Sequence, residues 1–313
     1  MSAVPVVLFA GGAARWPEWQ APLARALGEA GIEAEVTPEA APERVDFILY
    51  APGADTLDDF TPFANCRAVF SLWAGVERIV SNKTLTQPLC RMVDPGLTQG
   101  MVDYVCGHAL RLHLGLDALL AAQDGQWRPV PPPLASERSV AMLGLGALGA
   151  ACARALGDLG FAVSGWSRRE KALEGITCHH GHEGLRAVLE GAQIVVTLLP
   201  ATPETENILN AETLSWLPRG AMIINPGRGT LIDDDALLAA LDSGQVSQAT
   251  LDVFRKEPLP ADHPYWRHER VTVTPHIAAE TRPATAARVI AENIRRALAG
   301  EALMHLVDRQ AGY

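Results

Sequence analysis

Short apolar runs alternate with amphipathic segments along the first third of the chain. The apolar runs are VPVVLFA, FILYAP and CRAVFSLWAG, and the segment WQAPLARALGEAG carries its apolar residues at the spacing of one helix face. This alternation is typical of a parallel sheet with helices on its faces. We therefore predict an α/β unit from residue 4 to about residue 98.

The same alternation starts again in the second half of the chain. It begins at SVAMLGLGALGAACARALGDLG and continues through AVSGWS, AQIVVTLLP, AMIINPGRG, ATLDVF and VTVTPH. These short runs of Val, Ile and Leu, bounded by Gly, Pro or Asp, indicate a second parallel sheet. Between the two halves, residues 96–123 predict one long helix, and the following WRPVPPPL cannot be regular helix. We expect the chain to cross between two domains here.

The composition narrows the class of partner. The chain has 313 residues, enough for two domains, and 48% of them are hydrophobic, which allows both domains a packed core. Its 26 basic and 36 acidic residues give a formal charge of −10, which opposes non-specific binding to nucleic acid or to an anionic membrane. We therefore expect a small-molecule partner, no nucleic acid and no membrane.

The cysteines and the N-terminal residues favour a cytoplasmic location. The five cysteines are odd in number, scattered and never spaced as CxxC, which argues against a disulfide framework or a zinc knuckle. The opening MSAVPVVLFAGG has no basic region and indicates a buried strand rather than a signal peptide. The apolar segment 105–122 is interrupted by charged and histidine residues, which makes it a poor membrane span.

A glycine-rich turn predicts a dinucleotide site. Gly144, Gly146 and Gly149 stand in GxGxxG spacing, after the apolar run VAML and before a helix-forming segment. In this context the first glycine permits a tight turn, the second lets the backbone approach a pyrophosphate, and the third allows close helix packing. The alternative is a glycine-rich turn that binds nothing.

The residues after the next predicted strand bear on the choice of cofactor. Here a carboxylate would bind the ribose 2′ hydroxyl of NAD and repel the 2′-phosphate of NADP. This chain has Ser167, Arg168 and Arg169 instead. The two guanidinium groups suit charge-assisted contacts to a phosphate monoester, which favours NADP. Alternatively, they are solvated arginines of a surface loop.

Three further residues stand where apolar runs end, as catalytic groups of α/β proteins do: Arg228, Glu257 and His276. Each has an ordinary alternative, either a surface charge or a core histidine. Together they suit reduction of a 2-keto acid, in which a cation such as Arg228 holds the carboxylate and polarises the carbonyl. His276 would protonate the developing alkoxide, and Glu257 would orient the imidazole and favour its protonated form.

Several motifs in the same order resemble those of the D-isomer-specific 2-hydroxyacid dehydrogenase family. They are GLGALG, LLPATPET, NPGRGTLIDDDALLAALDSG, LDVFRKEPLP and TPHIAAET, and the resemblance covers essentially the whole chain. Within the family, LWAGVE, WSRR, HPYWRHERVTVTPHIAAETRP and the terminal VDRQAGY are most similar to members that prefer NADPH. One departure is Pro226 in NPGRG, where close relatives often have another residue.

The resemblance implies a role for each candidate residue. Arg228, Glu257 and His276 would be catalytic, and the backbone of Trp73, Ala74 and Gly75 would bind the substrate carboxylate together with Arg228. Asp252 would lie near the nicotinamide carboxamide. The full set of cofactor-binding candidates is Gly144, Gly146, Ala147, Leu148, Gly149, Ser167, Arg168, Arg169, Leu199, Pro200, Pro226, Gly227, Asp252 and His276.

The resemblance also implies the fold. We expect an α/β protein of two doubly wound parallel-sheet domains, with a dinucleotide-binding Rossmann domain over residues 99–284. A flavodoxin-like substrate domain would be discontinuous, formed by residues 1–98 plus 285–313, so that the C-terminal helix completes it. A homodimer is implied as well.

The implied activity is NADPH-dependent reduction of glyoxylate and hydroxypyruvate to glycolate and D-glycerate, with NADH as a second cofactor. One alternative is an NAD-linked D-2-hydroxyacid dehydrogenase that acts on other 2-keto acids. Another is a cofactor-sensing corepressor of the kind related to this family, although such proteins tend to carry extended tails.

Two polar clusters suggest other sites and are given less weight. CHHGH, residues 178–182, contains possible metal ligands, but a metal site needs ligands that converge from a defined scaffold. The run Asp233 to Asp235 opens a predicted helix, where acidic residues interact favourably with the helix N-terminus. We therefore predict no metal site.

Overall fold

The computed structural model describes residues 4–53, 57–309 and 312. The chain divides into two compact units: unit 1 comprises Met1–Leu97 and Glu280–Tyr313, and unit 2 comprises Thr98–Ala279. Part of the terminal VDRQAGY motif, namely Gln310, Ala311 and Tyr313, lies outside the described residues.

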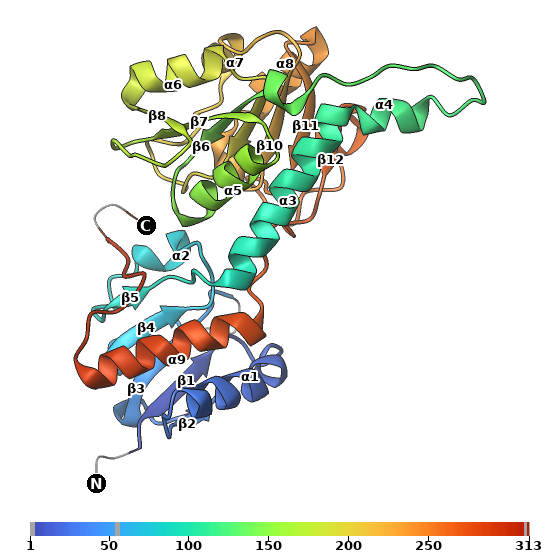
Figure 1. Cartoon of the computed structure of the whole chain (residues 1–313). Coiled ribbons are helices and arrows are strands. Elements are labelled where there is room, and N and C mark those ends of the chain that lie inside the picture. The colour runs from blue at the N-terminus through green and yellow to red at the C-terminus, as the bar shows by residue number, and fades with distance from the viewer. Residues whose placement is uncertain (1–3, 54–56, 310–311, 313) are drawn as a thin grey trace. The chain divides into compact units, whose positions relative to one another are not determined.

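The described part of unit 1 contains a five-stranded parallel sheet with strand order β2-β1-β3-β4-β5 (Figure 1). The strands are β1 (Val6–Ala10), β2 (Glu35–Thr37), β3 (Val45–Tyr50), β4 (Ala68–Ser71) and β5 (Leu89–Cys90). The helices are α1 (Trp16–Glu29), η1 (Pro42–Arg44), α2 (Glu77–Val80) and α9 (Pro283–Ala299). This order is that of flavodoxin-like doubly wound folds.

Each face of the unit 1 sheet is covered by its own apolar cluster. One cluster joins α1 and α9 to the sheet, and α9 contributes a stripe of small and branched residues that includes Ala287, Ile290 and Ile294. The other cluster includes Ile79 of α2 and the loop residues Phe60 and Phe63. The amphipathic helix near the C-terminus therefore packs beside the first helix of the chain.

The described part of unit 2 contains a seven-stranded parallel sheet with strand order β12-β11-β10-β9-β6-β7-β8. The strands are β6 (Ser139–Leu143), β7 (Ala162–Ser167), β8 (Thr177–His180), β9 (Ile194–Thr197), β10 (Ala221–Asn225), β11 (Val246–Leu251) and β12 (Val271–Val273). From β6 onward this is the Rossmann order, with its switch point between β6 and β9. The prediction of two doubly wound parallel sheets is confirmed.

Helices cover both faces of the unit 2 sheet (Figure 1). One face packs against α3 (Pro95–Leu114) and α5 (Ala147–Asp158), and the other against α6 (Gly181–Glu190), α7 (Ala211–Ser215) and α8 (Asp234–Ser243). Shorter elements are α4 (Leu116–Ala121), η2 (Ala135–Glu137), η3 (Gly229–Leu231) and η4 (Pro264–Arg267).

The prediction of one helix over residues 96–123 is wrong. Helix α3 ends at Leu114, and Gly115 adopts a left-handed conformation with φ of 64° before α4 begins. A glycine accepts this conformation without steric cost, so it ends the helix although the apolar spacing continues beyond it. Residues 116–134, here called the arm, then leave the body of unit 2 (Figure 1).

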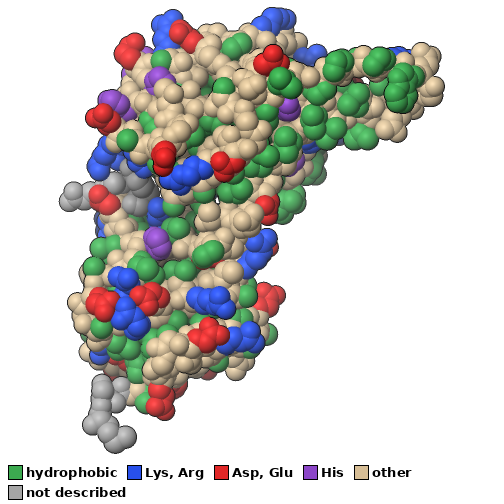
Figure 2. All heavy atoms as spheres, in the orientation of Figure 1, with side chains coloured by type: hydrophobic (Ala, Val, Ile, Leu, Met, Phe, Trp, Pro, Cys, Tyr) green, Lys and Arg blue, Asp and Glu red, His purple; other side chains and the backbone are tan. Residues whose placement is uncertain are grey.

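The arm exposes apolar side chains to an unusual degree (Figure 2). Leu120 is 65% exposed, Val130 74% and Trp127 95%. No helix among the described residues, α4 of the arm included, is both long and apolar enough to span a membrane.

The glycine turn of unit 2 provides a test of how tightly the fold is packed there. A Cβ at Gly149 would overlap the carbonyl of Gly144, whereas a Cβ at Gly157, in the same helix, would meet nothing within 4 Å. We expect Gly149→Ala to destabilise the protein by about 1–3 kcal/mol, because the helix must move away from the turn. The matched variant Gly157→Ala should instead stabilise it by about 0.5–1 kcal/mol. Urea unfolding of both variants measures this, and equal effects would contradict the packing argument.

Candidate active site

The predicted catalytic residues lie at one edge of the unit 2 sheet, beyond the carboxyl ends of adjacent strands. Arg228 follows β10, Asp252 and Glu257 follow β11, and His276 follows β12. The carboxyl ends of parallel strands meet at one edge, so residues far apart in sequence come together there.

His276 and Glu257 are in direct contact. Nδ1 of His276 lies 2.7 Å from Oε2 of Glu257, and Oε1 of the same carboxylate accepts a hydrogen bond of 2.9 Å from the backbone N–H of Phe254. Because both carboxylate oxygens are engaged, the orientation of Glu257 is fixed. The carboxylate places a proton on Nδ1 and leaves Nε2 as the ring nitrogen for proton exchange.

The solvent exposure of this pair limits its contribution to stability. The His276 side chain is 53% exposed and that of Glu257 is 31% exposed. Ion pairs so exposed contribute at most about 1 kcal/mol to stability. In addition, His276 has a φ of 54°, a left-handed conformation that costs energy for a residue with a Cβ. Together, the weak pair and the strained backbone are typical of a functional residue.

Arg228 is held by its own turn. Asn225, the last residue of β10, accepts hydrogen bonds from the Thr197 hydroxyl (2.6 Å) and the Gly227 N–H (3.1 Å) and donates one to the Arg228 carbonyl (3.0 Å). Asn225 is 1% exposed. A buried amide with these partners fixes the backbone on both sides of Pro226, and so the position from which the Arg228 side chain extends.

The turn of Arg228 also packs against the loop that carries Glu257. A Cβ at Gly229 would overlap the backbone of Phe254, whose N–H binds the Glu257 carboxylate. Glycine at this position therefore allows the two loops to approach closely. The loops that carry the three predicted catalytic residues therefore contact one another within unit 2.

The glycine-rich turn has the form that a dinucleotide requires. It follows β6 directly, Gly146 caps α5, and a Cβ at Gly144 would overlap the carbonyl of Leu198. A Cβ at Gly146, in contrast, would meet nothing within 4 Å, so the space beside it is open. The first N–H groups of α5, which include those of Ala147 and Leu148, face this end of the helix and suit a pyrophosphate. The residues present fit a dinucleotide.

The arginines stand at the end of the neighbouring strand β7. The Ser167 hydroxyl donates a hydrogen bond of 2.7 Å to the carbonyl of Arg169 and so closes the turn, with Arg168 and Arg169 both exposed. Lys171 in the same loop donates a hydrogen bond of 2.6 Å to the carbonyl of Leu145, within the glycine-rich turn. The basic loop is therefore tied to the predicted pyrophosphate site.

Leu199 and Pro200 follow β9 and border the same turn. The backbone N–H of Leu198 binds the carbonyl of Leu143 at the end of β6, which sets this loop beside the glycine residues. Nearby, the pKa of Glu204 is lowered by its own backbone N–H, by the Thr202 hydroxyl and, less strongly, by the Arg168 charge.

The predicted carboxylate-binding residues belong to unit 1. Trp73, Ala74 and Gly75 follow β4, and the Ser71 hydroxyl hydrogen-bonds the carbonyl of Trp73 (2.9 Å) and accepts from its N–H (3.1 Å). The Arg15 guanidinium lies 5.9 Å from the centre of the Trp73 ring. This turn is thus ordered by its own contacts.

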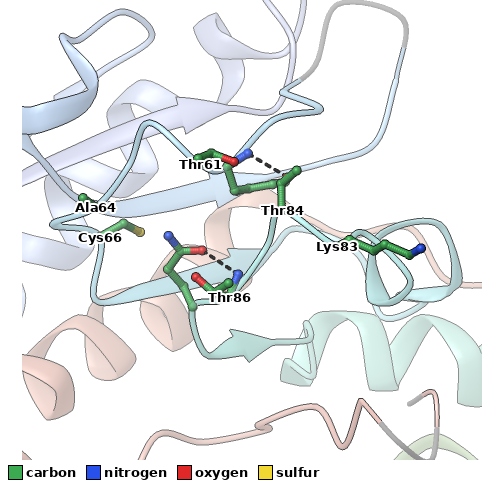
Figure 3. A pocket seen from close by; sticks show the side chains of 8 residues that line it. Thr61, Ala64, Cys66, Lys83, Thr84 and Thr86 are labelled. Carbon is green, nitrogen blue, oxygen red and sulfur yellow. Dashed lines mark hydrogen bonds between the residues drawn. The ribbon is translucent and has the colours of Figure 1, made fainter.

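A cavity of about 500 Å³ in unit 1 is separate from these residues (Figure 3). It is lined by Phe60, Thr61, Ala64, Cys66, Lys83, Thr84, Thr86 and Gln87. Burial raises the pKa of the Cys66 thiol to about 12, so this cysteine remains protonated and is not a nucleophile. None of the predicted site residues lines the cavity.

The two clusters given less weight do not form metal sites in the described part of the chain. No group of three or more His, Cys, Asp or Glu residues there could hold a metal ion. Asp233 caps α8, because its carboxylate accepts a hydrogen bond of 3.0 Å from the N–H of Ala236.

Comparison with known proteins identifies the family. Residues 108–278 match the family profile described as D-isomer specific 2-hydroxyacid dehydrogenase, NAD binding domain. This chain belongs to the D-isomer-specific 2-hydroxyacid dehydrogenase family. It is therefore an oxidoreductase that works with a dinucleotide, and the resemblance inferred from its motifs is confirmed.

Relatives match the dehydrogenase over almost its whole length. Glyoxylate/hydroxypyruvate reductase A of Serratia proteamaculans is 39% identical over 305 residues, which cover 95% of this chain and 96% of that one. A D-isomer specific 2-hydroxyacid dehydrogenase from Xanthobacter autotrophicus Py2, solved with NADPH and MES, is 42% identical with a TM-score of 0.91, covering 99% and 100% of the two chains.

A third relative is the NADPH-dependent glyoxylate/hydroxypyruvate reductase of Sinorhizobium meliloti, solved with NADP and sulfate. It is 33% identical, has a TM-score of 0.86, and covers 99% of this chain and 100% of its own.

Sequence reasoning missed four residues of this dehydrogenase site: Asn225, Tyr104, Thr274 and Lys171. Asn225 had a visible signal, since it ends an apolar run three residues before Arg228. Thr274 opens the motif TPHIAAET, two residues before His276, but nothing in the motif assigned it a partner. Tyr104 and Lys171 had no signal, because each contacts a loop from a different part of the sequence.

Proposed function

We propose that this dehydrogenase reduces glyoxylate and hydroxypyruvate to glycolate and D-glycerate with NADPH. The observation that carries the proposal is the loop after β7, where Ser167, Arg168 and Arg169 stand in place of an acidic residue. A carboxylate there would repel the 2′-phosphate of NADPH, whereas two guanidinium groups attract it. The similarity to named glyoxylate/hydroxypyruvate reductases supports the choice of substrate.

The proposed chemistry assigns one task to each catalytic residue. Arg228 binds the keto acid and polarises its carbonyl, and His276 gives a proton to the oxygen that becomes the hydroxyl. Glu257 orients the imidazole through the 2.7 Å contact to Nδ1. The dinucleotide supplies the hydride when bound. Proton and hydride together convert the keto group into a secondary alcohol, or into a primary one when the substrate is glyoxylate.

The remaining predicted residues are proposed to bind the two reactants. Unit 1 would act as the substrate domain, with the backbone of Trp73, Ala74 and Gly75 receiving the carboxylate. Unit 2 would act as the cofactor domain, and its cofactor residues include the glycine-rich turn, Leu199, Pro200, Pro226, Gly227, Asp252 and His276. A cytoplasmic location is supported by the five cysteines, which are all free thiols.

Turnover with a panel of keto acids tests the substrate and the cofactor. We expect glyoxylate and hydroxypyruvate to give higher kcat/KM than pyruvate or longer keto acids, and NADPH to be preferred to NADH, as followed by absorbance at the nicotinamide band. His276→Ala should lose about 10²–10⁴-fold in kcat, a much larger effect than any loss of NADPH affinity from removing its cofactor contact.

Other results would point to the alternatives. A preference for NADH and longer keto acids would indicate an NAD-linked dehydrogenase of another D-2-hydroxyacid. NADPH binding without turnover of any keto acid would favour a corepressor-like protein.

The two arginines give a sharper test of the cofactor. Replacing Arg168 and Arg169 by Ala should raise KM for NADPH at least tenfold and change KM for NADH by less than about threefold, because charge-assisted hydrogen bonds to phosphate contribute roughly 1.5–3 kcal/mol. Arg186→Ala, which removes a half-exposed arginine of α6, is the matched control and should change neither. Equal changes for both cofactors in the double variant would mean that the arginines do not recognise the 2′-phosphate.

We also propose that the protein is a homodimer formed through the arm. The arm combines exposed Leu120, Trp127 and Val130 with few charges, and its ion pair between Arg128 and Asp124 neutralises two of them. Exposed apolar surface of this kind on a projecting segment is typical of protein–protein contacts.

The mass in solution tests the dimer. Light scattering should give twice the chain mass of 33.5 kDa for the unaltered protein. Leu120→Asp together with Trp127→Asp should give the single-chain mass, because charges in an apolar interface are costly. Leu298→Asp, at a leucine of α9 that is 41% exposed, is the control and should leave the dimer intact. A single-chain mass for the unaltered protein would contradict the proposal.

A further inference from the structure

A chain of hydrogen bonds connects helix α3 to the loop of His276. The Tyr104 hydroxyl lies 2.7 Å from Oγ1 of Thr274, and Oγ1 of Thr274 donates a hydrogen bond of 2.6 Å to Oδ1 of Asp252. A threonine hydroxyl has one proton, and here that proton is directed to the carboxylate, so Tyr104 must be the donor of the first bond. Burial raises the pKa of Tyr104 well above its ordinary value, which keeps its hydroxyl protonated as a donor.

Asp252 in turn accepts hydrogen bonds from backbone N–H groups of the His276 loop. Oδ1 also accepts from the N–H of Ile277 and Oδ2 from the N–H of Ala278, both at 2.9 Å. The backbone carbonyl of Asp252 accepts a hydrogen bond of 2.9 Å from the N–H of His276 itself. Asp252 is 0% exposed, so water does not compete for these bonds.

The conformation of His276 explains why such an anchor is needed. A φ of 54° is unfavourable for a residue with a Cβ, and it persists only where the surroundings hold it. Donors on both sides of His276, from Thr274 and from Ile277 and Ala278, converge on one buried carboxylate. If a donor is lost, the loop can relax towards an ordinary conformation, and the imidazole then turns away from Glu257.

We propose that Tyr104 and Thr274 are positioning residues that hold His276 in its productive orientation through Asp252. This inference deepens the proposed function, on which its kinetic test rests. It also gives Asp252 a task within the protein in addition to the predicted place beside the nicotinamide.

Helix α3 and strand β12, directly before Thr274, provide a matched control. Nη2 of Arg111, two turns after Tyr104 on α3, donates a hydrogen bond of 2.9 Å to Oγ1 of Thr272. Thr272 lies two residues before Thr274, is similarly half-buried, and has no hydrogen bond to Asp252 among those of the described residues. Thr272→Val and Thr274→Val therefore make the same chemical change at two neighbouring contacts with α3, but only the second breaks the hydrogen-bond chain to Asp252.

Kinetics of these variants are the first measurement. We expect Thr274→Val to lose about tenfold or more in kcat, since small displacements of a catalytic group are costly, with KM for the keto acid and the dissociation constant of NADPH changed less than about twofold. Tyr104→Phe should lose about threefold or more in kcat. This loss is smaller than that of Thr274→Val because Thr274 keeps its hydrogen bond to Asp252. Thr274→Ser should restore kcat, and Thr272→Val should stay within about twofold of the unaltered enzyme.

Imidazole nitrogen NMR of the protein without substrate or cofactor is the second measurement and needs no activity. At a pH high enough for the ring to be neutral, the His276 signal, assigned by its absence in His276→Asn, should show one Nδ1-protonated tautomer in the unaltered protein and in Thr272→Val. It should broaden or shift in Thr274→Val and Tyr104→Phe. If Thr274→Val does not fold, Tyr104→Phe and Thr274→Ser carry the comparison.

The outcomes separate this inference from the proposed function. An unchanged His276 signal together with kcat within twofold in Tyr104→Phe and Thr274→Val would overturn the positioning role, as would equal losses in Thr272→Val. Loss of NADPH binding in proportion to kcat would show that the hydrogen-bond chain from Tyr104 to Asp252 acts on the cofactor instead. If no keto acid is turned over by the unaltered protein but the signal changes as expected, the proposed function fails and the positioning role stands.

Discussion

The arrangement of the candidate active site depends most on the hydrogen bonds that the buried carboxylate of Asp252 accepts. A charge removed from water costs several kcal/mol unless hydrogen bonds replace the lost hydration. Asp252 regains these bonds from the Thr274 hydroxyl and from two backbone N–H groups beyond His276. Asp252 directly follows β11, so the sheet fixes the position of its carboxylate. The carboxylate in turn fixes the loop of His276 through the hydrogen bonds it accepts. The left-handed backbone of His276 is thus held by the same hydrogen bonds that replace the lost hydration of a buried carboxylate.

At the end of the neighbouring strand β10, a neutral amide holds a loop in the same way. Asn225 ends β10 and uses its amide to hold the turn that carries Arg228. The N–H of Asp252 binds the carbonyl of Asn225, so the two anchors belong to one hydrogen-bonded strand pair. The cation and the acid of the proposed reaction therefore extend from adjacent, rigidly connected points. Preorganisation of this kind is needed when charge develops on the substrate during reaction, because the protein does not then have to rearrange.

The sequence predicted the sheets well because each strand is a short apolar run between turn residues, and this pattern is local. It also singled out Arg228, Glu257 and His276 as catalytic candidates, since all follow such runs and match family motifs, and the structure places them after neighbouring strands of one sheet. It failed where one residue overrides a pattern, as Gly115 does when it divides the predicted long helix. It could not find Tyr104, because its hydroxyl meets Thr274 across 170 positions and the residue otherwise resembles part of an apolar helix face.

The basic loop after β7 shows how the two kinds of information combine. The sequence gives its charges, two arginines and a lysine against Glu170, and predicts a preference for an extra phosphate. The structure adds that Ser167 closes the loop through the Arg169 carbonyl and that Lys171 reaches the glycine-rich turn. Because the arginines are exposed, their attraction to a phosphate is screened by salt and would be weak for freely moving side chains. The turn and the lysine contact fix the backbone from which the arginines extend, so the proposed recognition of NADPH would depend on the shape of this loop as much as on its charge.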